Sequence, residues 1–197
     1  MNTEATLPRR VTLVTGPARS GKSEWAETLA AQTGTSVIYV ATAQRDPGDV
    51  EWQTRIEQHQ CRRPAGWRTL EVPVELPATI RSFSQTDTCL LVDSLGTWVA
   101  NLLDQDVGGW EKTLQDLLTS LDDVAGEVIF VAEETGWGVV PAYPLGRTFR
   151  DRLGQLVRRL GAIANPVYLV TGGHVLNLCV LGSPLPMPVL KNLPPQY

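Results

Sequence analysis

Eight consecutive residues near the N-terminus have the types and spacing that bind nucleotide phosphates, and they match the pattern G-x-x-x-x-G-K-[ST]. In such a loop the backbone N–H groups surround the phosphates, the lysine reaches the β- and γ-phosphates, and the last hydroxyl binds Mg²⁺. The strand-like run Val11–Thr15 precedes the loop and the helical stretch Lys22–Gln32 overlaps its end. This order predicts a P-loop. Its phosphate-binding residues are Gly16, Pro17, Ala18, Arg19, Ser20, Gly21, Lys22 and Ser23.

Besides the P-loop hydroxyl, a carboxylate is needed to hold the metal of a P-loop enzyme. The short apolar run Cys89–Val92 reads as a buried strand, and Asp93 follows it directly. Ligands of open α/β sheets bind at the carboxyl ends of the strands. Asp93 is therefore predicted to act with Ser23 as a Mg²⁺ ligand or as a catalytic carboxylate. The alternative is that Asp93 caps the helix that begins near Ser94.

A histidine flanked by arginines offers a third kind of chemistry. Arg55 lies one helical turn before His59, and Arg62 and Arg63 follow it before the break at Pro64. Positive neighbours keep an imidazole neutral and hence nucleophilic near pH 7, and guanidinium groups hold anionic substrates. Attack of His59 on an α-phosphorus would release pyrophosphate and form a phosphoramidate.

The spacing also allows a purely structural His59. Trp52 and Ile56 lie on the same helical stripe, which is typical of a histidine packed in a core. Spacing alone leaves these two interpretations open. His174, in the run Gly172-Gly-His-Val, has no comparable neighbours and is predicted to be structural.

Composition limits what the chain can be. Its 197 residues suit one domain, and a net charge of −4 gives no bulk attraction to nucleic acid. Three widely spaced cysteines form no metal motif and are predicted to be reduced and mostly buried. We find no signal peptide and no apolar run long enough to span a membrane, so we expect a cytoplasmic protein without an integral membrane segment. Residues 1–9 are predicted to be a flexible leader.

The remaining elements must position these residues. Short apolar runs alternate with helical stretches, which predicts one α/β domain over residues 1–181, a mostly parallel sheet with helices on both faces. The proline-rich residues 182–197 are predicted to form an extended or disordered tail. Further expected strands are Val37–Ala41, Arg68–Val72, Cys89–Val92, Glu127–Ala132, Val167–Thr171 and Val175–Cys179. Further expected helices are Val50–Arg62, Ser94–Leu103, Trp110–Val124 and Leu145–Ala164.

Taken together, the motifs resemble a known family over residues from about Val11 to Leu181. The most specific are the P-loop with Ala-Arg-Ser inside it and the His-x-x-Arg-Arg-Pro segment from His59. On these residues the chain resembles the bifunctional adenosylcobinamide kinase/adenosylcobinamide-phosphate guanylyltransferases. Further matching segments are Tyr39–Ala43, Trp67–Glu71, Leu91–Asp93, Asn101–Leu103, Glu134–Pro141 and Phe149–Asp151.

The resemblance implies a P-loop NTPase fold and two reactions of cobalamin biosynthesis. In the first, ATP or GTP phosphorylates adenosylcobinamide; in the second, GMP passes from GTP to adenosylcobinamide phosphate. It implies that His59 carries the GMP covalently, with Lys22 and Asp93 as the other catalytic residues. It also implies a homo-oligomer, with a trimer as the form expected from the family. The further nucleotide-binding residues that it implies are Ala41, Thr42, Ala43, Arg62, Arg63 and Glu71.

Three places depart from the family's pattern. The chain has Glu133 where the family often has Asn, Val157-Arg158 in place of Asn-Gln, and Asn177-Leu-Cys179 where a lysine is usual. These positions concern the corrinoid side and the kinase step more than guanylyl transfer. Two other functions therefore stay open: a P-loop small-molecule kinase without guanylyltransferase activity, and a protein that binds GTP without chemistry.

Overall fold

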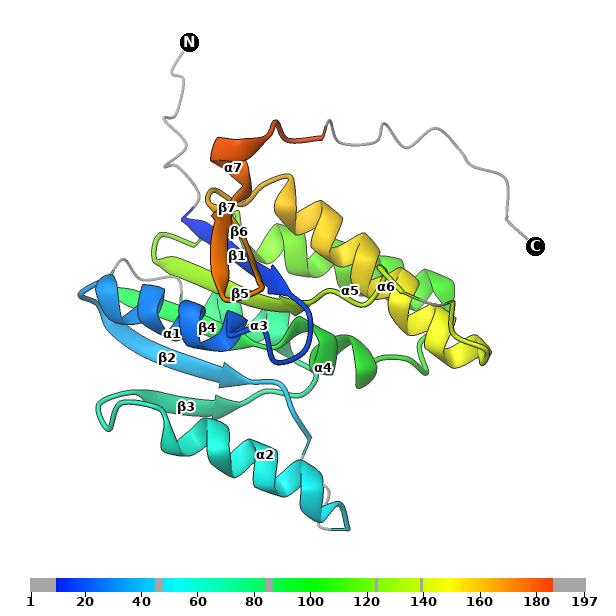
Figure 1. Cartoon of the computed structure of the whole chain (residues 1–197), viewed down its shortest axis with the longest axis horizontal. Coiled ribbons are helices and arrows are strands. Elements are labelled where there is room, and N and C mark those ends of the chain that lie inside the picture. Colours follow the sequence, from blue (N-terminus) through cyan, green and yellow to red (C-terminus); the bar gives the residue numbers. More distant parts are fainter. Residues whose placement is uncertain (1–9, 45–47, 84–86, 123, 139, 186–197) are drawn as a thin grey trace.

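The computed structural model describes residues 10–44, 48–83, 87–122, 124–138 and 140–185. Its centre is a seven-stranded sheet in the order β3-β2-β4-β5-β1-β6-β7 (Figure 1). All neighbouring strands are parallel except β6 and β7, which are antiparallel. The strands are β1 (Val11–Gly16), β2 (Ser36–Ala41), β3 (Arg68–Glu71), β4 (Thr88–Asp93), β5 (Glu127–Glu133), β6 (Val167–Thr171) and β7 (His174–Asn177).

Helices connect most of the parallel strands. Because parallel strands run in the same direction, each connection must cross back over the sheet, and helices make that crossing. In Figure 1, α1 lies on one face of the sheet, α5 and α6 lie on the other, and α2 lies by the edge strand β3. The helices are α1 (Lys22–Gln32), α2 (Val50–Cys61), α3 (Leu76–Ser82), α4 (Leu95–Ala100), α5 (Val107–Ser120), α6 (Pro144–Gly161) and α7 (Leu178–Leu181).

The hydrophobic core is divided between the two faces of the sheet. On one face, α1 packs Ala26 and Ala30 against the strands. On the other face, the larger cluster takes in residues of α3, α4, α5 and α6, with Trp98 and Trp110 among them. Strands covered on both faces must be apolar throughout, which is why the sequence shows them as continuous apolar runs. The predicted α/β class with helices on both faces is confirmed.

The structure corrects several predicted element boundaries. The helix Leu76–Ser82 was not expected, and the expected strand Val175–Cys179 ends at Asn177. There the Asn177 side chain accepts a hydrogen bond from Cys179 N at 3.0 Å and caps the short helix α7. Helix α5 begins before Trp110 because Asp106 caps it through Gly109 N at 2.7 Å.

The cysteine prediction is confirmed in one part and wrong in another. All three cysteines are free, but only Cys89 is buried, while Cys61 and Cys179 are exposed. Cys61 is the last residue of α2, and Cys179 lies in the short helix α7. Among the described helices, none is both long and apolar enough to cross a bilayer. The predicted leader 1–9 and residues 186–197 of the predicted tail lie outside the described residues.

Candidate nucleotide-binding site

The predicted site residues gather at the carboxyl edge of the sheet. Strand register places Ala41 opposite both Asp93 and Glu71, the last residue of β3. It also places Gly16, where the P-loop begins, opposite Glu133 at the end of β5. Because β5 lies between β1 and β4, the end of β5 lies between the P-loop and Asp93. The sheet therefore brings phosphate-binding and acidic residues to one edge.

The P-loop backbone has the conformation that its glycines allow. Gly21 has a φ of 90° and Arg19 a φ of 60°, both in the left-handed region. A Cβ on Gly16 would lie 2.3 Å from the Val170 carbonyl oxygen, so only glycine fits beside β6. The Ser20 Oγ is buried without a hydrogen-bond partner in the described structure. A buried unpaired hydroxyl inside this loop suits a phosphate oxygen as its partner.

Lys22 is almost fully buried at the start of α1, with 8% of its surface exposed. Its ammonium group lies 3.4 Å from the Pro17 carbonyl oxygen across the loop. A buried lysine is costly unless an anion compensates its charge. This placement suits the predicted contact of Lys22 with nucleotide phosphates.

Glu133 is a carboxylate of this site that the sequence marked only as a departure from the family's pattern. Its Oε2 accepts a hydrogen bond from Gly96 N, at the start of α4, at 2.9 Å. Burial raises the pKa of Glu133, and the repulsion of Asp93 adds to it. A hydrogen bond to Ser94 and the charge of Lys22 act in the opposite direction. Glu133 is therefore influenced by the charges of both Lys22 and Asp93.

The turn that follows Asp93 is fixed by hydroxyl groups. The Thr42 hydroxyl donates to the Ser94 carbonyl oxygen at 2.7 Å and accepts from Ser94 N at 3.0 Å. Ser94, rather than Asp93, caps α4, forming a capping box with Thr97. The side-chain amide of Asn101 binds the Thr42 carbonyl at 2.8 Å. The helix-capping alternative for Asp93 is therefore wrong, and the hydroxyl of Thr42 is already engaged.

Asp93 and Arg63 are joined through one buried tyrosine. The Tyr39 hydroxyl donates to Asp93 Oδ2 at 2.7 Å. The guanidinium carbon of Arg63 lies 3.5 Å from the centroid of the same ring, which is a cation–π contact. Arg63 also donates to the Thr69 hydroxyl at 3.2 Å. The sequence indicated Tyr39 only as the start of the Tyr39–Ala43 segment that the family resemblance implies in nucleotide binding. Nothing local signals its contact with a residue 54 positions away.

Arg62 ties the end of α2 to the helix that follows the P-loop. It pairs with Glu24 Oε1 at 3.0 Å and with Glu27 Oε1 at 3.7 Å. Burial raises the pKa of Glu27, although the charge of Arg62 opposes this. Position 59 lies on α2 within one turn of Arg62. The side chains of His59 and Arg55 lie outside the described part of the structure.

The residues suit Mg²⁺ bound together with a nucleotide. No cluster of three or more His, Cys, Asp or Glu side chains is found among the described residues. Mg²⁺ in nucleotide enzymes takes one or two protein ligands and fills its other positions with phosphate oxygens and water. Ser23, beside Lys22, and Asp93 carry the hydroxyl and carboxylate oxygens that such a site uses.

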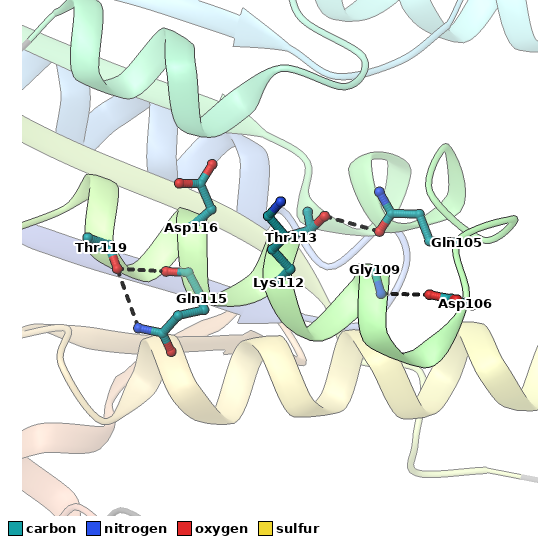
Figure 2. Close-up of a pocket in the computed structure, with 8 residues that line it drawn as sticks. All are labelled: Gln105, Asp106, Gly109, Lys112, Thr113, Gln115, Asp116 and Thr119. Atoms are coloured by element: carbon teal, nitrogen blue, oxygen red, sulfur yellow. Dashed lines mark hydrogen bonds between the residues drawn. The ribbon is translucent and has the colours of Figure 1, made fainter.

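A shallow pocket elsewhere does not belong to this site. It lies along α5, on the opposite face of the sheet from α1, and includes Gln105, Lys112, Asp116 and Thr119 (Figure 2). Asp116 forms an ion pair with Arg81. None of the predicted site residues lines this pocket, so we place the site at the sheet edge.

The three departures from the family's pattern lie at the end of β5, on α6 and at the junction of β7 and α7, where Asn177, Leu178 and Cys179 stand. Glu133 lies at the sheet edge, as described. Val157 packs against the core from α6, and Arg158 is exposed near the end of that helix. His174 is exposed on β7 with its Nδ1 2.9 Å from the Gly172 carbonyl oxygen.

Comparison with known proteins agrees with this geometry. A family model described as cobinamide kinase / cobinamide phosphate guanyltransferase matches residues 12–178. The chain belongs to this family. The bifunctional adenosylcobalamin biosynthesis protein CobP of Pseudomonas aeruginosa is 45% identical over 174 residues, covering 88% of this chain and 98% of CobP. The CobU proteins of Escherichia coli and Salmonella typhimurium, described in the same words, are 37% identical over 175 residues, covering 82% of this chain and 95% of each.

A solved structure of the RadB recombinase also matches, with a TM-score of 0.44 and 17% identity over 82% of this chain and 74% of that chain. Membership of the cobinamide kinase/guanyltransferase family confirms the resemblance seen in the sequence, the nucleotide-using enzyme class and the link to cobalamin biosynthesis.

Proposed function

We propose that this member of the cobinamide kinase/guanyltransferase family carries out both reactions at the carboxyl edge of its sheet. It phosphorylates adenosylcobinamide and then converts the product to adenosylcobinamide-GDP. The observation that carries this proposal is the convergence of Lys22, Asp93 and Arg63 at one sheet edge, with the P-loop beside them. A protein that only binds GTP has no need of this set of charged groups.

In the kinase step, the hydroxyl of adenosylcobinamide attacks the γ-phosphorus of ATP or GTP. The O–P bond to the nucleoside diphosphate breaks, and the hydroxyl proton is lost. Lys22 and the P-loop N–H groups neutralise charge on the phosphate oxygens as it shifts to the leaving diphosphate. Gly21 opens the loop for this contact through its left-handed backbone.

We propose that Ser23 and Asp93 hold Mg²⁺ with the nucleotide. When bound, Mg²⁺ lowers the negative charge that an incoming nucleophile meets at the phosphates. The Tyr39 hydroxyl donates to Asp93 Oδ2 and helps to hold this carboxylate at the end of β4.

In the transferase step, the neutral imidazole of His59 attacks the α-phosphorus of GTP and pyrophosphate leaves. The adenosylcobinamide phosphate then attacks the guanylyl group, and the P–N bond to His59 breaks. Arg62 and Arg63 neutralise phosphate charge during both displacements. In the structure Arg62 is paired with Glu24 and Glu27, so it must exchange carboxylate for phosphate oxygens when GTP binds.

The other nucleotide contacts belong to the same proposal. Ala41, Thr42, Ala43 and Glu71 lie at or just beyond the ends of β2 and β3, next to Asp93. Because Ser94 engages the Thr42 hydroxyl and Asn101 engages its carbonyl oxygen, we expect residue 42 to support the nucleotide by packing and not by a hydrogen bond of its own. We also propose a cytoplasmic homo-oligomer, with a trimer as the expected form.

Incubation with α-labelled GTP and Mg²⁺ tests the transferase step. We expect a labelled protein adduct that is labile in acid and stable in base, as a phosphoramidate is. His59→Ala should abolish the adduct while retaining the kinase reaction, and His174→Ala should change neither. A His59→Ala protein that still forms the adduct would refute the assignment. A wild-type protein that phosphorylates adenosylcobinamide without forming the adduct would be a kinase alone.

A further inference from the structure

Tyr39 occupies an unusual position, because its two ends contact two different parts of the proposed site. It lies in β2, the second strand from the β3 edge of the sheet, and only 2% of its surface is exposed. Its hydroxyl reaches Asp93 Oδ2 at 2.7 Å on the neighbouring strand β4. Its ring face lies under the Arg63 guanidinium, whose carbon is 3.5 Å from the ring centroid.

The hydroxyl of Tyr39 acts as a hydrogen-bond donor. Burial raises the pKa of Tyr39 far above its usual value, and the negative charge of Asp93 raises it further. Since an ionised carboxylate is an acceptor only, the direction of the bond to Asp93 is fixed.

The ring of Tyr39 gives Arg63 a fixed seat. Arg63 follows the end of α2 and precedes β3, so its backbone belongs to neither element. Its Nε is buried without a hydrogen-bond partner in the described structure. The described contacts that hold its guanidinium are the Tyr39 ring and the Thr69 hydroxyl. A guanidinium over an aromatic face keeps the edges of its plane available to bind phosphate.

We propose that Tyr39 is a positioning residue that orients the carboxylate of Asp93 through its hydroxyl and the guanidinium of Arg63 through its ring. The inference rests on the proposed function, in which Asp93 holds the metal and Arg63 holds the nucleotide. It adds a prediction of its own, since the two roles use different parts of one side chain. Tyr39→Phe should remove only the first role, and Tyr39→Leu should remove both.

Binding of GTP, measured by calorimetry with Mg²⁺ and with EDTA, separates the two roles without requiring turnover. For Tyr39→Phe we expect the gain in GTP affinity that Mg²⁺ provides to fall about tenfold, which matches a lost hydrogen bond to a charged group. The affinity in EDTA should stay within about twofold, because Arg63 keeps its seat. For Tyr39→Leu we expect the affinity in EDTA to fall as well, by roughly 3- to 10-fold.

Tyr168→Phe is the matched control. Tyr168 belongs to β6 on the same face of the sheet, where its ring packs edge-on against Trp25 with centroids 5.6 Å apart. Tyr168→Phe also removes one phenolic hydroxyl, from a residue that packs against the core cluster of Tyr39 but belongs to a different strand from Tyr39 and Asp93. We expect both GTP affinities to stay within about twofold of wild type. Thermal unfolding of each variant shows whether it is folded at the temperature of the titration.

The outcomes distinguish this inference from the proposed function. If Asp93→Asn removes the Mg²⁺-dependent gain while Tyr39→Phe leaves it intact, the inference for the hydroxyl is wrong and the metal site stands. If Asp93→Asn also leaves the gain intact, the metal role of Asp93 is wrong and the hydroxyl role is lost with it. If Tyr39→Phe and Tyr39→Leu weaken binding in EDTA equally, the ring does not seat Arg63.

Discussion

The close contact between Gly96 and Glu133 predicts an unusual effect of a small substitution. A Cβ added to Gly96 would lie 2.0 Å from Glu133 Oε2 and 2.8 Å from its Cδ, both well inside van der Waals contact. The carboxylate must therefore move and lose the hydrogen bond that its Oε2 accepts from Gly96 N at 2.9 Å. Gly96→Ala thus leaves the Glu133 carboxylate without this hydrogen bond, although Glu133 itself is unchanged.

The expected size of the effect follows from two opposing contributions. A hydrogen bond to a charged group contributes about 1.5–3 kcal/mol. Replacing glycine by alanine in a helix gains at most about 0.5–1 kcal/mol. The net loss of stability is then about 0.5–2.5 kcal/mol. For a chain of this size each kcal/mol changes the melting temperature by roughly 2–4 °C, so we expect Gly96→Ala to lower it by roughly 1–10 °C.

Thermal unfolding in two backgrounds isolates the contact. In the Glu133→Ala background the carboxylate is gone, and Gly96→Ala should be neutral or slightly stabilising. Gly154→Ala is the matched control, because Gly154 is also helical and a Cβ there would meet nothing within 4 Å. We expect Gly154→Ala to raise the melting temperature by about 1–4 °C. An equal loss from Gly96→Ala in both backgrounds would refute the reasoning.

Three further predictions follow from other contacts. Because the pKa of folded Glu133 lies above its ordinary 4.5, the native state binds more protons than the unfolded state, and the free energy of unfolding should fall as pH rises above 4.5. Glu133→Gln should flatten this fall when urea unfolding is measured at a series of pH values. An unchanged dependence of the unfolding free energy on pH would contradict this prediction. Arg152 is buried and donates to the Leu102 carbonyl at 2.8 Å and to the Gln105 carbonyl. Arg152→Met should therefore lower the free energy of unfolding in urea by about 1–3 kcal/mol. The exposed control Arg158→Met should lower it by under about 0.5 kcal/mol. Lys22→Met should lower GTP affinity at least about tenfold. It should not lower the melting temperature without GTP, because the substitution removes a buried charge that no phosphate then compensates. Unchanged affinity would exclude Lys22 from the phosphate site.

Sequence alone determined the features that depend on neighbouring residues. The P-loop was predictable because strand, glycine loop and helix follow one another, and the structure places them as Val11–Gly16 and Lys22–Gln32. Most strands were predictable because a sheet covered on both faces requires continuous apolar runs. The short helix α3 was missed, since seven residues carry too little periodic signal.

The tertiary structure decided what distant residues do to one another. Sheet order places β5 between β1 and β4, and this brings Glu133 between the P-loop and Asp93. The Gly96–Glu133 bond spans 37 positions and the Tyr39–Asp93 bond spans 54. Local sequence cannot encode such pairs, because the order and register of strands are set by the packing of the whole sheet. The role of His59 stays a prediction from the sequence and the family. The contacts of Asp93 and Arg63 with Tyr39 became visible only in the fold.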